Sequence, residues 1–113
     1  MKIVLKNEKS YPIKSVNRSV VTDLKKSAYV EKAPKENPVS AYIANILLQI
    51  PESGIFNLFE LIKDFSIENI SELKFENGLN QILTEGYDVV YSISQNISEY
   101  VNETTIVLVK YNY

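Results

Sequence analysis

Short apolar runs separated by polar turns occupy the beginning of the chain. Apolar residues dominate 3–5 and 11–16, and a polar segment, 7–9, lies between them. Two β-favouring runs around such a segment predict an opening β-hairpin. Val20 and Val21 are expected to extend its second strand.

Residues 23–39 depart from this pattern. They carry lysines and glutamates around Pro34 and Pro38, and their apolar positions show little periodicity. Such a composition is typical of a mobile loop or a projecting arm. A chain of 113 residues is long enough for one hydrophobic core and too short for a second independent unit. We therefore expect a single domain, residues 1–113, with a polar loop or arm at about 23–39.

Residues 40–50, which include the longest apolar stretch (41–50), are compatible with two structures. Their side chains satisfy the spacing of an amphipathic helix and also that of a buried strand. We expect a strand, because Pro51 ends the stretch and a clear helical pattern follows directly. The residues that fit both patterns are Tyr42, Ile43, Ile46, Leu47 and Ile50.

Residues 55–65 show the three-and-four spacing of an amphipathic helix. Ser53 is a suitable N-cap for it. Glu60, Lys63 and Asp64 are expected to face solvent. The predicted buried face consists of Ile55, Leu58, Phe59, Ile62 and Phe65.

A second hairpin is predicted after this helix. Leu73 and Phe75 alternate with charged residues, as expected of a strand with one buried face. Asn77 and Gly78 follow, a dipeptide that favours a tight type I′ turn. The return strand of this hairpin is expected at 79–84.

Two further strands are predicted beyond Gly86. Residues 105–111 are apolar at nearly every position, which is typical of a strand buried on both faces, either within a sheet or at an interface. Residues 87–93 alternate instead, as a half-buried strand does. The predicted buried face of that strand consists of Tyr87, Val89, Tyr91 and Ile93.

No strand–helix–strand unit repeats along the chain, so every connection between strands can be antiparallel. The predicted fold class is α+β. It should contain a mainly antiparallel β-sheet, arranged as a sandwich or a small barrel-like structure, with one short helix.

The chain contains no histidine and no cysteine. Catalytic triads and metal sites that require an imidazole or a thiolate are therefore excluded. The three glycines are isolated, so the sequence has no glycine-rich phosphate-binding loop. We expect no catalytic residue, no cofactor and no metal.

Two reactive groupings remain to be considered. Ser71 and Lys74 match a Ser-x-x-Lys motif, but that motif requires a helix, and this segment is predicted to be a strand that directs the two side chains to opposite faces. Glu60 and Asp64 are four residues apart on the predicted outer face of the helix. Acid–base catalysis would require one of these carboxyls to be buried. The sequence therefore indicates a protein that is not an enzyme.

Charge is unevenly distributed, although the net charge is only −2. Residues 1–38 contain nine Lys/Arg and four Asp/Glu, whereas residues 39–113 contain three and ten, so the two parts carry +5 and −7. Such asymmetry can produce complementary faces that favour head-to-tail packing of identical subunits. Alternatively, the fold interleaves the two parts and the charges cancel.

Tyrosines and lysines are the candidate contact residues. Tyrosine combines apolar area with a hydrogen-bonding tip, which suits a protein interface as well as a core or edge position. The lysines of the first part, with Tyr11 and Tyr29, resemble a nucleic-acid surface. The single arginine and the interrupting glutamates argue against that partner. The candidate protein-contact residues are Tyr100, Tyr111, Tyr113, Lys25, Lys26, Lys32 and Lys35.

Three phrases of the sequence carry a family resemblance: “MKIVLKNEKSYPIKSVNRS”, “FNLFELIKDFSIENISELKFENG” and “NETTIVLVKY”. With them the chain resembles small tail-region or virion structural proteins of tailed phages and prophages of low-GC Gram-positive bacteria. The pattern of that group is an opening hairpin, a short helix, a strand with a turn and a closing strand. The resemblance contains no catalytic motif and transfers no site residue.

The resemblance implies a non-enzymatic structural or assembly protein of a phage particle, in the tail, baseplate or connector region. Its expected partners are other copies of itself or other phage structural proteins. An alternative is a small phage-encoded inhibitor that binds a host or anti-phage defence protein. The sequence shows no secretory signal and no apolar segment long enough to span a membrane, so we expect the virion or the host-cell cytoplasm.

Overall fold

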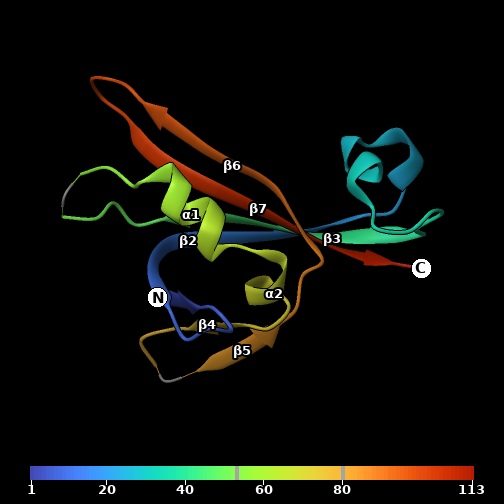
Figure 1. Cartoon of the computed structure of the whole chain (residues 1–113), viewed down its shortest axis with the longest axis horizontal. Helices are drawn as coiled ribbons and strands as arrows, with labels where there is room; N and C mark the ends of the chain where they lie inside the picture. Colours follow the sequence, from blue (N-terminus) through green and yellow to red (C-terminus); the bar gives the residue numbers. More distant parts are fainter. Residues whose placement is uncertain (53, 80) are drawn as a thin grey trace.

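The computed structural model describes residues 1–52, 54–79 and 81–113. Within them, strands form one antiparallel sheet in the order β5-β4-β1-β2-β3-β7-β6, accompanied by two short α-helices (Figure 1). The predicted α+β class is confirmed, although the helical part exceeds the one helix expected. The strands are β1 (Lys2–Val4), β2 (Ser10–Val21), β3 (Ser40–Leu48), β4 (Leu73–Glu76), β5 (Ile82–Glu85), β6 (Val89–Ile97) and β7 (Asn102–Asn112), and the helices are α1 (Leu58–Asp64) and α2 (Ile67–Ile70).

Strand β2 belongs to both halves of the sheet. Its first residues pair with β1, so that Pro12 lies opposite Lys2, whereas Ile13 and the part from Ser15 onward pair with β3. A register shift between Ile13 and Ser15 marks an irregularity of the β-bulge type, which bends a strand and increases its twist. The sheet therefore divides into a three-stranded half (β1, β4 and β5) and a four-stranded half (β2 from Ser15, β3, β7 and β6), one below the other in Figure 1.

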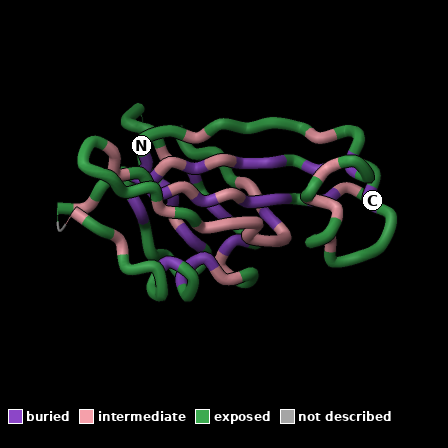
Figure 2. Tube along the Cα trace, turned by 90° about the horizontal axis from the view of Figure 1, so that it is seen from above, coloured by how far each residue is buried: buried purple, intermediate pink, exposed green. Residues whose placement is uncertain are grey.

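The main hydrophobic core lies between these two halves and the α-helices. Successive residues of a strand point to opposite faces, and the even-numbered buried residues of β3 and β7 point into this core. Figure 2 shows the buried positions concentrated in the interior strands. The core includes Ala44, Ile46, Leu48, Ile106 and Leu108 from the four-stranded half, Leu61, Phe65 and Ile70 from the helical region, and Ile3, Leu73 and Phe75 from the three-stranded half.

A second, smaller core lies on the opposite face of β3 and β7. It is covered by segment 23–39, which contains two 3₁₀-helices, η1 (Leu24–Lys26) and η2 (Ala28–Lys32). In Figure 1 this segment lies over the end of the sheet near the C-terminus. Strand β7 is thus buried on both faces inside the sheet, as predicted for 105–111. The buried members of the second core are Leu24, Ala41, Ile43, Val109 and Tyr111.

The predicted start of the first helix is wrong. Helix α1 begins at Leu58, because Asn57 Oδ1 accepts hydrogen bonds from the backbone N–H groups of Phe59 and Glu60 at 3.0 and 3.3 Å. Ser53, the predicted cap, lies outside the described residues. Both α-helices are short, and in the part of the chain that the structure describes no helix is long and apolar enough to cross a membrane.

The predicted buried face of this helix is also wrong. Asp64, expected in solvent, is buried where Tyr11 and Lys9 contact its carboxylate. This contact fixes the rotation of the helix about its axis. The buried residues at its end are consequently Leu61, Asp64 and Phe65, while Ile55, Leu58, Phe59 and Ile62, four of the five expected in the core, are exposed.

The β4–β5 hairpin is confirmed, but its predicted turn type is wrong. Gly78 does not adopt the positive φ that a type I′ turn requires. Instead, the side-chain oxygen of Asn77 accepts hydrogen bonds from the N–H groups of Leu79 and Gln81 at 2.9 and 3.2 Å. These bonds stabilise a longer loop between the strands.

The predicted face of β6 is wrong as well. The pairing with β7 shifts between Val90 and Ser92, which leaves Tyr91 as an extra residue. Val89 and Tyr91 therefore pack against the second core, whereas Ile93 packs against the main one. A period of two reverses its faces wherever a strand contains one extra residue.

Candidate protein-contact surfaces

A buried carboxylate joins the opening hairpin to helix α1. The hydroxyl of Tyr11 donates a hydrogen bond to Asp64 Oδ2, and Lys9 Nζ lies 2.6 Å from the same oxygen. The ring of Tyr11 also packs against those of Phe56 and Phe65. The cluster thus ties β2 to both ends of the helical segment.

The pKa values of these three groups are those expected of a cluster with a structural role. Burial, followed by the contact with Asp64, raises the pKa of Tyr11 to about 12. The hydrogen bond to Asp64 raises the pKa of Lys9. Burial alone would raise the pKa of Asp64, but hydrogen bonds from Lys9 and Tyr11 outweigh it and lower that pKa. At neutral pH Asp64 is therefore ionised and its partners are protonated, and this cluster has no proton to exchange near pH 7.

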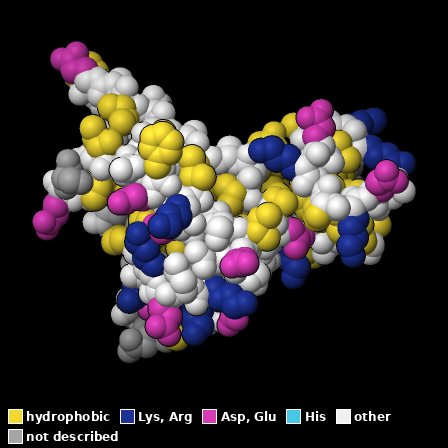
Figure 3. All heavy atoms as spheres, in the orientation of Figure 1, with side chains coloured by type: hydrophobic (Ala, Val, Ile, Leu, Met, Phe, Trp, Pro, Cys, Tyr) yellow, Lys and Arg dark blue, Asp and Glu magenta, His cyan; other side chains and the backbone are white. Residues whose placement is uncertain are grey.

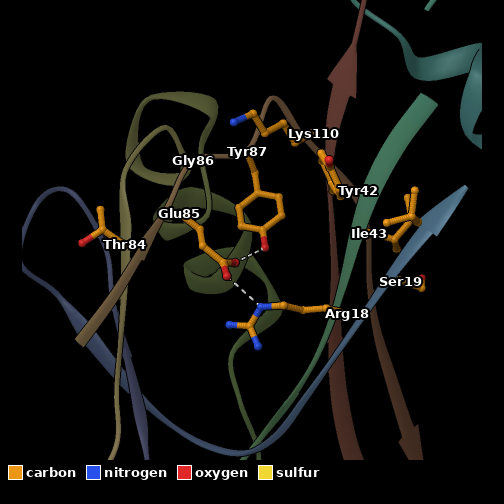
Figure 4. A pocket seen from close by; sticks show the side chains of 10 residues that line it. Arg18, Ser19, Tyr42, Ile43, Thr84, Glu85, Gly86, Tyr87 and Lys110 are labelled. Atoms are coloured by element: carbon orange, nitrogen blue, oxygen red, sulfur yellow. Dashed lines mark hydrogen bonds and ion pairs between the residues drawn. The ribbon is translucent and has the colours of Figure 1, made fainter. Parts of the chain in front are cut away.

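A groove of about 360 Å³ lies between β5 and the face of β2 and β3 (Figure 4). Arg18 reaches across it, with its Nε 2.8 Å from Glu85 Oε1, and the hydroxyl of Tyr87 donates to Glu85 Oε2. The guanidinium also lies 4.8 Å from the centre of the Phe75 ring. Burial, followed by the contact with Glu85, raises the pKa of Tyr87 well above its ordinary value, so its hydroxyl stays neutral.

The structure places the candidate reactive groups of the sequence among its described residues. No cluster of three Asp or Glu there could hold a metal ion. Ser71 of the Ser-x-x-Lys motif donates its hydroxyl hydrogen to the carbonyl of Glu68 at 2.7 Å, and Lys74 is exposed on β4. The Ser71 hydroxyl thus stabilises the local backbone.

Four of the candidate contact residues help to hold segment 23–39 against the end of the sheet near the C-terminus. They are Lys32, Lys35, Tyr111 and Tyr113. Lys32 Nζ donates to the carbonyl of Tyr91 at 2.7 Å. The hydroxyl of Tyr113 donates to the carbonyl of Lys35 at 3.1 Å. Tyr111 is buried, and its hydroxyl bonds the carbonyl of Tyr29.

The other three candidates are exposed but lie at two places. Lys25 and Lys26 are on η1, where Lys26 Nζ lies 3.7 Å from a carboxylate oxygen of Asp23. Tyr100 is 89% exposed and lies in the turn between β6 and β7, at the far end of the molecule (Figure 1). The fold therefore does not gather the seven candidates into one site.

Helix α1 presents the surface that the sequence analysis missed. Phe59 is 85% exposed, Ile62 60% and Leu58 38%, and we call these three residues the α1 surface. Figure 3 shows hydrophobic side chains gathered over this helix. Glu60 and Lys63 border it. Single exposed apolar residues are ordinary, but a group of them with a charged border is typical of a protein-contact site.

The signal for the α1 surface was present in the sequence. Residues 55–65 contain apolar side chains on more than one side of the predicted helix. A helix as short as α1, which spans 58–64, can bury only part of such a set against one core. The excess of apolar positions therefore indicated either a fully buried helix or an interface.

The fold brings the basic and acidic parts of the chain together. Ion pairs connect residues before position 38 with residues after it, and Figure 3 shows both signs of charge mixed on one face. Of the two alternatives for the charge asymmetry, interleaving is therefore favoured. The connecting pairs are Lys2 with Glu76, Lys9 with Asp64 and Arg18 with Glu85.

No protein-family model, curated protein or solved structure matches the chain. Its function is therefore inferred from the surfaces that the fold leaves exposed.

Proposed function

We propose that this chain is a non-enzymatic assembly protein that acts through protein–protein contacts in the tail, baseplate or connector region of a phage particle. The α1 surface is the observation that carries the proposal. Removing an apolar side chain of the size of Phe59 or Ile62 from water contributes about 1.5–3 kcal/mol. An aromatic residue surrounded by aliphatic ones has the composition of an interface centre.

The polar clusters support a role without catalysis. Tyr11, Lys9 and Tyr87 have raised pKa values and Asp64 a lowered one, so each of these groups keeps one protonation state around neutrality. Catalytic acids and bases are normally tuned toward the working pH instead. These side chains serve to hold the halves of the sheet and the helix together.

The phage setting is supported by the sequence phrases and by the order of the elements. The resembling proteins have an opening hairpin, a short helix, a strand with a turn and a closing strand. This chain has the same order in β1–β2, α1, β4–β5 and β7. The interleaved charges, by contrast, mix both signs on the face seen in Figure 3, whereas an inhibitor imitating nucleic acid would present a purely acidic face.

Mass spectrometry of purified particles of the phage that encodes the chain tests this proposal. We expect the chain in the particles at a defined copy number and a marked loss of Phe59→Asp from them. Val39→Asp is the matched control, because Val39 is also an exposed apolar residue, at 68%, and lies away from α1. Absence of the chain from particles, together with stoichiometric capture of one host protein, would favour the inhibitor and overturn the proposal.

A further inference from the structure

We propose that copies of this chain assemble head to tail by extending the four-stranded half of the sheet, so that β6 of one copy pairs with β2 of the next. This inference rests on the proposed function and deepens it. It identifies a second copy of the chain as the partner and the two sheet edges as the contact.

The four-stranded half has an open edge on each side. Among the described residues, β6 pairs with β7 alone, and β2 from Ser15 to Val21 pairs with β3 alone. Figure 2 shows β2 as a mostly exposed trace along one margin of the sheet. An open edge presents a row of backbone N–H and C=O groups that another strand can pair with.

The pairing pattern assigns the outward-pointing groups of β6. Ser98 donates its N–H to the carbonyl of Val101 at 2.7 Å and closes the β6–β7 turn. Bonded and non-bonded pairs then alternate along an antiparallel ladder. Ile93, Gln95 and Ile97 therefore direct their N–H and C=O groups away from β7.

The same alternation assigns the outward groups of β2. Residues of β7 that bond β6 alternate with residues that bond β3, and the residues of β3 alternate likewise between β7 and β2. Following this pattern across the sheet leaves Val16, Arg18 and Val20 directed outward. Each edge thus offers three residues whose backbone groups can receive a partner strand.

The directions of the two edges match. The strands follow the order β2-β3-β7-β6, and each neighbouring pair is antiparallel, so β6 runs opposite to β2. A second copy in the same orientation therefore places its β2 antiparallel to β6 of the first. Such a contact joins two different surfaces and can repeat from copy to copy into a ring or a helical array.

Apolar side chains lie beside both edges, on the same face of the sheet. Beside β6 lies α1, whose preceding segment is held by a hydrogen bond from Gln95 Nε2 to the carbonyl of Phe56 at 3.0 Å. Beside β2 lies a hollow formed with β5 and lined in part by Met1, Ile82 and Leu83, which are 53%, 60% and 50% exposed. Head-to-tail packing brings the α1 surface of one copy against this hollow of the next, and both are removed from water.

The charges at the two edges are complementary. The β6–β7 hairpin carries Glu99 in its turn and Glu103 at the adjoining end of β7, whereas β2 carries Lys14 and contains no acidic residue. Ser94 of β6 is level with Ser15 of β2 across the four strands. The acidic tip therefore extends toward the end of β2 that carries the lysine, and it meets that end in the next copy.

Two edge variants test the arrangement. Val20→Pro and Ile97→Pro each remove an outward N–H, which an edge strand tolerates because its own ladder keeps every bond. Val20→Thr and Ile97→Thr retain the N–H and are the matched controls. Sedimentation velocity measures association, and circular dichroism confirms the fold. We expect each proline variant to associate about tenfold or more weakly than the wild type, and the controls to behave as the wild type.

The decisive sample is an equimolar mixture of the two proline variants. Val20→Pro keeps an intact β6 edge and Ile97→Pro keeps an intact β2 edge, so the mixture should form dimers and stop there. A mixture that stays monomeric while the wild type associates would overturn the head-to-tail contact and leave the proposed function standing. A wild type that is monomeric at every concentration, yet is found in particles, would also overturn it.

A second pair of variants applies where proline disturbs folding. Phe59→Asp changes the surface beside β6, and Leu83→Asp changes the hollow beside β2. Both side chains are at least half exposed, so neither substitution empties the core. The same dimer is expected on mixing them, and failure to form it would count against the proposal in the same way.

Discussion

The hydroxyl of Tyr11 donates a hydrogen bond to the buried carboxylate of Asp64, which joins β2 to helix α1 across 53 positions of sequence. Asp64→Ala removes the acceptor and leaves the Tyr11 hydroxyl and the Lys9 ammonium without it. We expect a loss of about 1–3 kcal/mol in the free energy of unfolding, measured by urea denaturation. Glu60→Ala, on the exposed side of the same helix, should change it by less than about 0.5 kcal/mol. Equal effects of the two substitutions would contradict this role of Asp64.

The raised pKa of Tyr11 predicts a loss of stability in alkaline solution. The folded protein holds the Tyr11 proton up to a pKa of about 12, while the unfolded chain releases it near the ordinary value of 10.0. The stabilisation is therefore complete below pH 10 and is lost as the pH rises from 10 toward 12. The difference between these two pKa values corresponds to roughly 2–3 kcal/mol of unfolding free energy.

Unfolding of the wild type and of Tyr11→Phe between pH 8 and pH 12 checks this prediction. The variant should be less stable at pH 8 and should lose less stability on the way to pH 12. Tyr100→Phe, at an exposed position, should retain the slope of the wild type. A Tyr11→Phe slope that equals the wild-type slope would show that another group causes the alkaline loss.

Gly86 is required where the chain passes close to the end of α2. A Cβ atom at this position would lie 2.5 Å from the backbone oxygen of Ser71, so the backbone has to shift to accept it. Gly86→Ala should cost about 1–3 kcal/mol of unfolding free energy, as overpacking does. Gly78→Ala is the matched control, because a Cβ there meets nothing within 4 Å and its φ is not positive. Thermal denaturation of the two variants should separate them clearly, and the reverse order would refute this explanation.

The strands were largely predictable because their signals are local. The period of two, the polar turn at 7–9 and the proline after residue 50 each act over a few residues, and β1, β2, β3 and β7 followed from them. The errors occurred where distant contacts decide the structure. The extra residue Tyr91 shows no local signal, and it reverses the faces of β6.

Distant contacts also decide the positions of the candidate contact residues. Lys32 and Tyr91 are 59 positions apart, and only the folded sheet shows that the lysine bonds the carbonyl of the extra residue. Composition could identify tyrosines and lysines as contact-forming residue types. It could not show that Tyr111 would be used inside the molecule while Tyr100 remains in solvent. Edge strands likewise become recognisable only when the order of the sheet is known.

Helix α1 provides the sharpest comparison between the pattern of the sequence and the fold. The spacing of apolar residues predicted that Ile62 is buried and did not predict this for Leu61. In the structure Leu61 is 1% exposed and Ile62 is 60% exposed. Leu61→Ala should therefore lower the free energy of unfolding by about 2–5 kcal/mol, since it removes core contacts and leaves a cavity. Ile62→Ala should lower it by less than about 1 kcal/mol and should instead weaken self-association, because Ile62 belongs to the α1 surface. Urea denaturation together with sedimentation velocity separates the two effects, and a strong destabilisation by Ile62→Ala with normal association would mean that the helix buries the face that the sequence pattern indicated.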